Sequence, residues 1–237
     1  MSERLTLPAL QAMKREGRKI VGVVAWDYQA ARIVDRAGVD VVSVGDSVGV
    51  NLWGRENEAD VTLDEQILVC AAVRRGVRRA LVSCDLPLGY GVDAARRLVE
   101  EGGADLVKLD DADAAPAFVD AGIQVFAQFS HGSGSDDELV AQAKQLEAAG
   151  ASLLDFRDSG PIAGPKVVEA VSIPVIGGLG GGPWLDGRMR MIHRAIGYDA
   201  SALDAPPDAY ANVAQITYDA IAAYADDVRG GRQIKGG

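Results

Sequence analysis

The chain repeats one pattern of hydrophobic and polar positions. A short run rich in Val, Ile and Leu is followed by a polar or glycine-rich turn and then by a segment with helical spacing. Near-continuous β-branched runs are typical of parallel strands that are buried on both faces. Strands are expected at 19–26, 40–47, 80–87, 106–111, 124–130, 152–159 and 174–180, with a weaker eighth around 189–198.

These strand–helix units predict an α/β fold, a single (β/α)8 TIM barrel domain over residues 1–237, because such barrels take roughly 250 residues. An extra N-terminal helix is expected at 6–16, across the bottom of the barrel. Apolar spacing within 208–229 predicts a long C-terminal helix, whose stripe suits either the barrel or a neighbouring subunit. A doubly wound open sheet is the alternative fold, since periodicity does not give strand order.

Polar residues and glycines mark the expected helix boundaries. Thr62 with Glu65, and Ser135 with Glu138, fit the capping box at a helix N-terminus. Glycine favours the position that follows a helix. Helices are therefore expected to end at Gly38, Gly76, Gly122 and Gly150.

The net charge of the chain limits the classes of molecule that it is expected to bind. Asp and Glu outnumber Lys and Arg by 34 to 24, which gives a formal net charge of −10. Nucleic acids and anionic membranes favour clustered basic residues, so neither is expected as a partner. The N-terminal segment lacks the apolar core of a signal peptide, and no run approaches the ~18 apolar residues of a membrane span. We therefore expect a cytoplasmic protein.

Aspartates end four successive expected strands. A single one is unremarkable, because Asp also serves in turns and helix caps. In a barrel, however, the C-terminal ends of the strands meet at one mouth, where four carboxylates repel one another unless a cation is present. A divalent ion with oxygen ligands, Mg²⁺, resolves that repulsion. The four residues are Asp27, Asp46, Asp85 and Asp110.

Further polar residues follow the same strand ends. Lys108 and Asp110 are two positions apart, so their side chains leave the same face of a strand. A lysine that points into a barrel needs an anionic partner, which is either a protein carboxylate or a substrate carboxylate. Other candidates lie at the ends of the fifth and sixth expected strands: Gln128, His131, Asp155, Arg157 and Asp158.

The blocks around these residues resemble a known family. VVSVGDSVG at 41–49, SCDLPLGYG at 83–91 and GADLVKLDD at 103–111 carry VGDS, DLP and VK-x-acid motifs in this order. The sequence is similar to the ketopantoate hydroxymethyltransferase family, in the wider phosphoenolpyruvate-mutase/isocitrate-lyase barrel group. The similarity extends to AGASLLDF at 149–156 and IPVIGGLGGG at 173–182.

The resemblance implies a metal-dependent transferase. The family's metal ligands match Asp46 and Asp85, and its third acidic group matches Asp110, where the family usually has Glu. The metal binds the carboxylate and keto oxygen of a small 2-oxo acid and acidifies the adjacent C–H bond. A base takes the proton, and the enolate attacks a one-carbon group carried by 5,10-methylenetetrahydrofolate.

The resemblance also implies a substrate site and an assembly. Ser47 and Lys108 match the residues that hold the 2-oxo acid, and the expected substrate site also includes Gly45 and Gln128. Relatives assemble into rings of subunits, so a homo-oligomer is expected.

Three features depart from the family pattern. Arg157 stands where the family has its catalytic glutamate, and arginine cannot accept a proton at neutral pH. Asp158, nearer the mouth, is then preferred as the base over the deeper Asp155; alternatively, Arg157 clamps an anionic substrate group. The family's Gly-His is Ala-Gln at 127–128, and the segment SHGSGSDDE at 130–138 is much shorter than its counterpart.

The preferred interpretation is a Mg²⁺-dependent enzyme that forms a carbon–carbon bond on a small 2-oxo acid, with a changed substrate or base. One alternative is a lyase or hydrolase that cleaves a C–C or C–P bond, although the KKCGH-like signature of such lyases is absent. Another is a non-catalytic homologue that binds an oxo acid.

Overall fold

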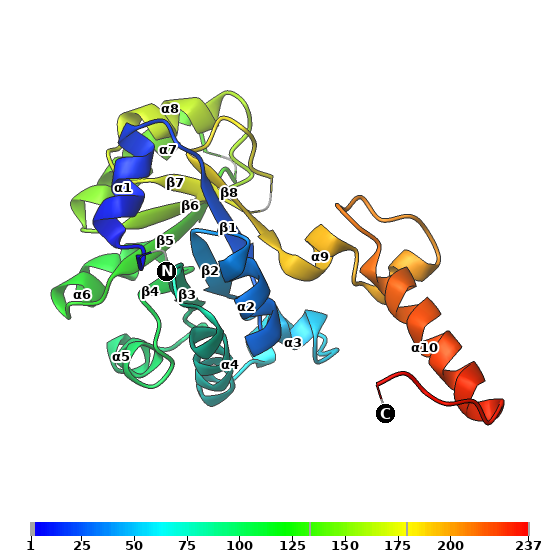
Figure 1. Ribbon diagram of the computed structural model, residues 1–237. Helices are drawn as coiled ribbons and strands as arrows, with labels where there is room; N and C mark the ends of the chain where they lie inside the picture. The colour runs from blue at the N-terminus through cyan, green and yellow to red at the C-terminus, as the bar shows by residue number, and fades with distance from the viewer. Residues whose placement is uncertain (1–2, 133, 179, 237) are drawn as a thin grey trace. The chain divides into compact units, whose positions relative to one another are not determined.

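The predicted barrel is confirmed by the computed structural model, which describes residues 3–132, 134–178 and 180–236. Its strands are parallel neighbours in sequence order and close on themselves (Figure 1). They are β1 (Ile20–Val24), β2 (Val41–Val44), β3 (Leu81–Asp85), β4 (Leu106–Leu109), β5 (Val125–Ser130), β6 (Leu153–Arg157), β7 (Val175–Gly177) and β8 (Gly187–Met191).

Helices alternate with the first strands and surround them (Figure 1). Those that follow β1 to β6 are α2 (Tyr28–Arg36), α4 (Leu63–Gly76), α5 (Val92–Glu100), α6 (Ala115–Asp120), α7 (Asp136–Ala148) and α8 (Ala163–Ala170). The other helices are α1 (Leu7–Arg15), α3 (Val48–Asn51), α9 (Ile192–Ile196) and α10 (Val213–Arg229), with short 3-10 turns η1 (Glu58–Asp60), η2 (Ala112–Ala114) and η3 (Ala200–Leu203).

One large apolar residue from every strand points into the barrel and forms its core. These side chains are buried together with Leu10 and Met13 of α1, so α1 closes the N-terminal end of the barrel as the sequence predicts. Full burial of each such side chain contributes about 1.5–3 kcal/mol. The strand residues are Ile20, Val41, Leu81, Leu106, Phe126, Leu153, Ile176 and Met189.

The eighth strand lies earlier than the expected 189–198. It begins at Gly187 and ends at Met191, because the next five residues form α9. Gly187 brings this strand against β1: a Cβ at this position would contact the Ile20 backbone oxygen and lie 2.9 Å from a methyl of Ile176. The absence of a side chain therefore permits the barrel to close.

Replacing Gly187 with Ala is expected to lower the free energy of unfolding by about 1–3 kcal/mol, because the added methyl overpacks the closure of the barrel. Urea unfolding measures the change. Gly178→Ala is the matched control, since among the described residues its Cβ would meet only the Met189 carbonyl oxygen, at 3.7 Å. Equal stability of the two variants would contradict the role given to Gly187.

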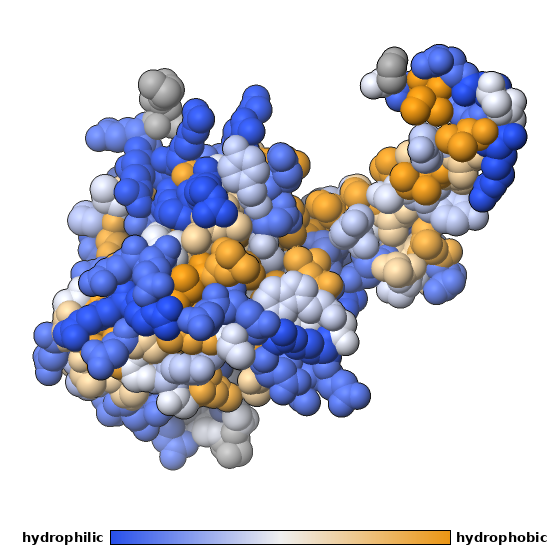
Figure 2. Space-filling model, turned by 90° about the horizontal axis from the view of Figure 1, so that it is seen from below, coloured by the Kyte–Doolittle hydropathy of each residue, from blue (hydrophilic) through white to orange (hydrophobic). Residues whose placement is uncertain are grey.

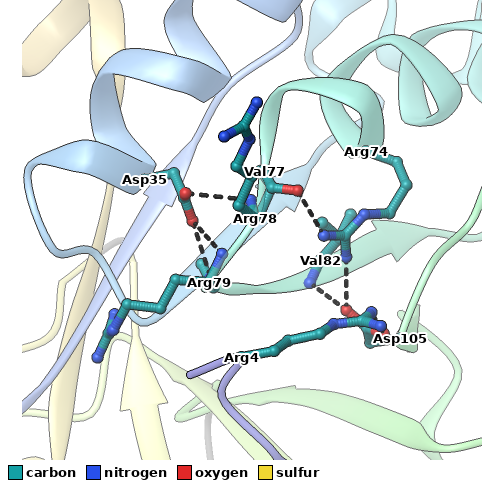
Figure 3. Close-up of polar contacts among 9 residues, drawn as sticks. Arg4, Asp35, Arg74, Val77, Arg78, Arg79, Val82 and Asp105 are labelled. Carbon is teal, nitrogen blue, oxygen red and sulfur yellow. Dashed lines mark hydrogen bonds and ion pairs between the residues drawn. The ribbon is translucent and has the colours of Figure 1, made fainter. Parts of the chain in front are cut away.

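Charged side chains fix the connection between α4 and β3 at the N-terminal end of the barrel (Figure 3). The Asp105 carboxylate accepts hydrogen bonds from Arg4 at 2.5 Å, from Arg74 at 3.0 Å and from the backbone N–H of Val82 at 2.9 Å. The Asp35 carboxylate accepts the backbone N–H groups of three consecutive residues, Arg78, Arg79 and Ala80. The side chains of Arg4 and Arg74 therefore have a structural partner in Asp105.

Both predicted capping boxes are formed, at Thr62 of α4 and Ser135 of α7. Of the glycines expected to end helices, Gly38, Gly122 and Gly150 adopt left-handed backbone. Gly76 is the last residue of α4, at the helix end that the sequence predicts. A Cβ there would lie 2.7 Å from the Tyr28 carbonyl oxygen, so this glycine permits close packing of α4 on α2.

The chain divides into two compact units, residues 1–190 and 191–237. That residues 1–237 form one domain therefore stays a prediction.

The predicted C-terminal helix is confirmed as α10, while Tyr210 of the expected stripe precedes it. Large apolar side chains on α10 are exposed, among them Ile216, Ile221 and Tyr224. Hydrophobic residues at the surface are orange in Figure 2. Within the described ranges, no helix has the length and apolar character needed to cross a bilayer.

Candidate active site

A polar layer lies above the apolar core, toward the C-terminal ends of the strands. Successive inward side chains are two residues apart, and two positions beyond the core residues stand Ser43, Ser83, Lys108, Gln128 and Asp155. The buried hydroxyls of Ser43 and Ser83 are joined by a hydrogen bond of 2.9 Å. The barrel thus changes from apolar to charged within one layer.

Lys108 is the buried cation of this layer. Its Nζ lies 3.0 Å from Asp155 Oδ2 and 3.8 Å from Asp85 Oδ2. Burial lowers the pKa of Lys108, but the charges of Asp85 and Asp155 outweigh this effect and the pKa is raised above its ordinary value. Lys108 therefore stays charged and already has protein partners, which fits the structural one of its two predicted roles.

The charge of Lys108 only partly offsets the burial of the Asp85 carboxyl group. Burial raises its pKa from 3.8 to about 7, the charge of Lys108 opposes the rise, and Asp46 and Asp110 add to it. Its Oδ1 has no hydrogen-bond partner among the described residues. The same holds, within that part of the chain, for Asp155 Oδ1 and Gln128 Oε1. Buried oxygens without partners are rare and indicate a missing donor or cation.

Gly45 lies close to Ser47, a predicted substrate-binding residue, and to Asp85, a predicted metal ligand. A Cβ at this position would be 2.8 Å from Ser47 Oγ and 3.6 Å from Asp85 Oδ2. The indole N–H of Trp26 donates to the Gly45 carbonyl oxygen at 3.1 Å and fixes this turn. The half-buried Asp46 follows, and burial together with the charge of Asp110 raises the pKa of its carboxyl group. The turn after β2 therefore gathers oxygens around a space that only glycine leaves open.

The predicted metal site is a pair of carboxylates with a third at the rim. Asp110 is exposed, although its charge acts on both Asp46 and Asp85. Across the described residues, no three Asp, Glu, His or Cys side chains converge closely enough to enclose an ion. Mg²⁺ is usually held by one or two carboxylates and completed by water and substrate oxygens. The residues fit such an ion, and they do not form an all-protein cage.

Three candidate residues were predicted around the sixth strand. Asp155 and Arg157 lie in β6, and Asp158 follows its last residue. Asp155 is buried, and its Oδ2 lies 3.7 Å from Arg157 Nε. The Arg157 side chain is 35% exposed and its charge acts on Asp46. Asp158 has left-handed backbone with φ 51°, and its carboxylate lies against Gly180 in the connection after β7. Asp155 and Arg157 therefore belong to the charged layer, and Asp158 faces the neighbouring loop.

Two predicted candidates have other roles or positions. The Asp27 carboxylate caps α2 by accepting the backbone N–H groups of Gln29 and Ala30 at 2.8 and 2.9 Å. His131 lies 4.0 Å from Asp136, beside the first turn of α7. The short segment 130–138 also includes residue 133, which is outside the described residues.

Glu58 is a charged residue of the site that sequence reasoning missed. It begins η1, in the connection between β2 and α4. Four charged residues of the site act on its carboxyl group: Asp46, Arg157, Asp110 and Lys108. The available signal was the acidic segment RENEAD at 55–60, which follows a strand that ends in a candidate metal ligand.

Comparison with known proteins decides the family. The family model described as ketopantoate hydroxymethyltransferase matches residues 4–233. The chain belongs to the ketopantoate hydroxymethyltransferase family. Proteins named 3-methyl-2-oxobutanoate hydroxymethyltransferase from Salinibacter ruber and Moorella thermoacetica are each 35% identical to it, over 95% and 97% of this chain and 95% of each relative. The resemblance predicted from the motifs is confirmed, and the chain is an enzyme of this family.

Solved structures agree with the fold of this ketopantoate hydroxymethyltransferase family member. A crystal structure of 2,3-dimethylmalate lyase, described as a PEP mutase/isocitrate lyase superfamily member, aligns with a TM-score of 0.66 and 16% identity, covering 98% of this chain and 91% of the other. A phosphonopyruvate hydrolase complex aligns with a TM-score of 0.62 and 15% identity, covering 95% and 88%. These similarities support the barrel fold.

Proposed function

We propose that the enzyme transfers a hydroxymethyl unit to the enolate of a small 2-oxo acid with the help of Mg²⁺. The observation that carries the proposal is the turn after β2, where Gly45 leaves a space beside Ser47 Oγ and Asp85 Oδ2. The Nζ of the buried, charged Lys108 lies 3.8 Å from the same Asp85 oxygen. Membership of the family supports the reaction class.

Asp46 and Asp85 are the proposed ligands of the ion, and Asp110 adds negative charge from the rim. The Oδ1 of Asp85, which has no hydrogen-bond partner within the described ranges, and the raised pKa of both ligand carboxyl groups support a cation at this place. When bound, Mg²⁺ supplies Lewis-acid polarisation of the keto group, which acidifies the neighbouring C–H bond.

The substrate carboxylate is proposed to bind through Ser47 and Lys108. The Ser47 hydroxyl is half-buried at the turn, and the Lys108 ammonium is the cation nearest to Asp85. Gln128 lies at the register position beside Asp155, and its buried Oε1 has no partner in the described ranges, so its amide is available to orient the substrate. Gly45 leaves the space in which the 2-oxo acid would lie.

The one-carbon donor is proposed to be 5,10-methylenetetrahydrofolate. The transfer forms one C–C bond between the C3 carbanion of the 2-oxo acid and the methylene carbon of the donor. Water then supplies the hydroxyl group as the carrier leaves. Arg157, at the mouth, is proposed to hold an anionic group of the substrate or donor.

Proton exchange at C3 tests the first half of this reaction. In D₂O with Mg²⁺, the C3 proton signal of 3-methyl-2-oxobutanoate is expected to disappear from the ¹H NMR spectrum, because abstraction followed by return of a deuteron labels C3. With EDTA the signal is expected to persist. Equal exchange in both samples, or none in either, would contradict the proposal.

Two further outcomes concern the product and the assembly. Cleavage products from a 2-hydroxy diacid or a phosphonate, without condensation, would support the lyase or hydrolase alternative, which the cation at Arg157 favours. A homo-oligomer also remains a proposal, supported by the exposed apolar side chains of α10.

A further inference from the structure

The turn after β2 is built around a residue that has little conformational preference of its own. Gly45 stands there because a Cβ at this position would lie 2.8 Å from Ser47 Oγ and 3.6 Å from Asp85 Oδ2. Glycine has more backbone freedom to lose on folding than any other residue. The direction in which the next residue, Asp46, leaves the strand is therefore set by contacts from outside the turn.

Gln66 of α4 supplies one of these contacts. Its Nε2 donates a hydrogen bond of 2.9 Å to the carbonyl oxygen of Val44, the last residue of β2. Chemistry fixes the orientation of the amide, because a carbonyl oxygen only accepts and the amide NH₂ group donates. Gln66 and Val44 are both 0% exposed, so bulk water does not compete for this bond.

Trp26 supplies a second contact, from the segment that follows β1. Its indole N–H donates to the Gly45 carbonyl oxygen at 3.1 Å. The two accepting oxygens belong to successive peptide groups, Val44–Gly45 and Gly45–Asp46, and each peptide group is planar. Holding both planes restrains the two backbone dihedral angles of the glycine between them. The position of Asp46 therefore depends on two buried donors from different elements.

Packing alone does not explain the polar side chain of Gln66. Its Oε1 is buried and has no hydrogen-bond partner among the described residues, and a buried polar atom without a partner destabilises the fold. An apolar side chain of similar size would avoid this cost but would leave the Val44 oxygen without its donor. The other buried side chains of α4 are apolar or a thiol: Leu63, Ile67, Val69, Cys70 and Val73.

We infer that Gln66 is a positioning residue of the proposed metal site. The inference rests on the proposed function, in which Asp46 and Asp85 bind Mg²⁺. Gln66 is not a ligand in this scheme: it acts through the Val44–Gly45 peptide group, which directly precedes Asp46. Residues that orient the ligands of a metal typically contribute about 10–100-fold to its affinity.

Replacing Gln66 with Met removes the donor and keeps an unbranched side chain of similar length. In EDTA, hydrogen–deuterium exchange followed by mass spectrometry is expected to become about tenfold faster over residues 45–52, because the turn opens more often. This segment contains the Val48 N–H, which donates to the Gly45 carbonyl oxygen at 3.2 Å. Mn²⁺ affinity, followed by water proton relaxation, is expected to fall by about 10–100-fold.

Ile67→Val is the matched control. It removes one methylene group from the next buried position of α4 and takes away no hydrogen-bond donor. It is expected to lower the stability of the protein to urea while the exchange of residues 45–52 and the Mn²⁺ affinity equal those of the unmodified enzyme. Trp26→Phe removes the second donor and is expected to release the same segment. Gln66→Leu removes the same amide and replaces Gln66→Met if that variant does not fold.

Unchanged exchange over residues 45–52 in Gln66→Met would overturn the inference, because the turn would then not depend on this donor. Faster exchange with unchanged Mn²⁺ affinity would also overturn it, since Gln66 would then serve the fold alone. In both cases Mn²⁺ binding by the unmodified enzyme leaves the proposed function standing. If the unmodified enzyme binds no Mn²⁺, the proposed function is wrong and the role of Gln66 falls with it.

Discussion

Replacing Asp85 with Asn is expected to stabilise the metal-free protein at pH 8 and to abolish its Mg²⁺-dependent proton exchange. Asp85 is buried, and its pKa is about 7 in the folded chain against an ordinary value of 3.8. Between these values the folded chain holds a proton that the unfolded chain has released. The free energy of unfolding therefore falls as the pH rises through this window.

The full difference between the two pKa values corresponds to about 4 kcal/mol above pH 7, as an upper bound. Asn resembles the protonated carboxyl group and removes this pH-dependent loss, but it supplies no negative charge to a cation. Urea unfolding in EDTA at pH 5 and pH 8 measures the effect. Asp27→Asn is the control, because Asp27 caps α2 and Asn is an equally good cap.

The expected pattern is specific to Asp85. The unmodified protein should lose stability between pH 5 and pH 8 in EDTA, and the loss should be smaller in Asp85→Asn than in Asp27→Asn. Lower stability of Asp85→Asn at pH 8 would contradict the interpretation, since it would mean that the ionised carboxylate stabilises the fold. The site would then hold its charge for a structural reason and not for a cation.

The barrel could be predicted because its strands repeat a local pattern. Seven strands are near-continuous apolar runs, which periodicity detects. The eighth was misplaced because β8 alternates: Gly187 and Met189 are buried, whereas Arg188 and Arg190 are exposed. A half-buried strand of five residues resembles neither a buried strand nor a helix start, and only its pairing with β7 reveals its bounds.

The site was predictable where side chains follow the alternation of a strand. Asp85 and Lys108 face inward because each stands two or four positions beyond a core residue. Alternation fails at Asp158, where left-handed backbone redirects the side chain. It also gives no information at Glu58, which lies in η1 and outside any strand. Contacts between distant side chains leave no periodic trace in a sequence.

Replacing Lys108 with Met is expected to lower the free energy of unfolding by about 3–5 kcal/mol near neutral pH, the usual effect of removing one partner of a buried ion pair. Lys108 is 4% exposed and lies between Asp155 and Asp85. Without its charge, both carboxylates remain buried beside each other. Urea unfolding measures the loss, which should shrink as the pH falls below about 7 and the carboxyl group of Asp85 protonates.

A double variant decides between the two predicted roles of Lys108. Lys108→Met with Asp155→Asn removes both members of the 3.0 Å pair and is expected to recover part of the stability, because Asp85 is then the one carboxyl group of the two that has lost its cation. If 2-oxo acid binding stays lost in this stable double variant, Lys108 contacts the substrate carboxylate. If binding returns with stability, the lysine serves the fold alone, and the substrate carboxylate must bind through Ser47 and the ion.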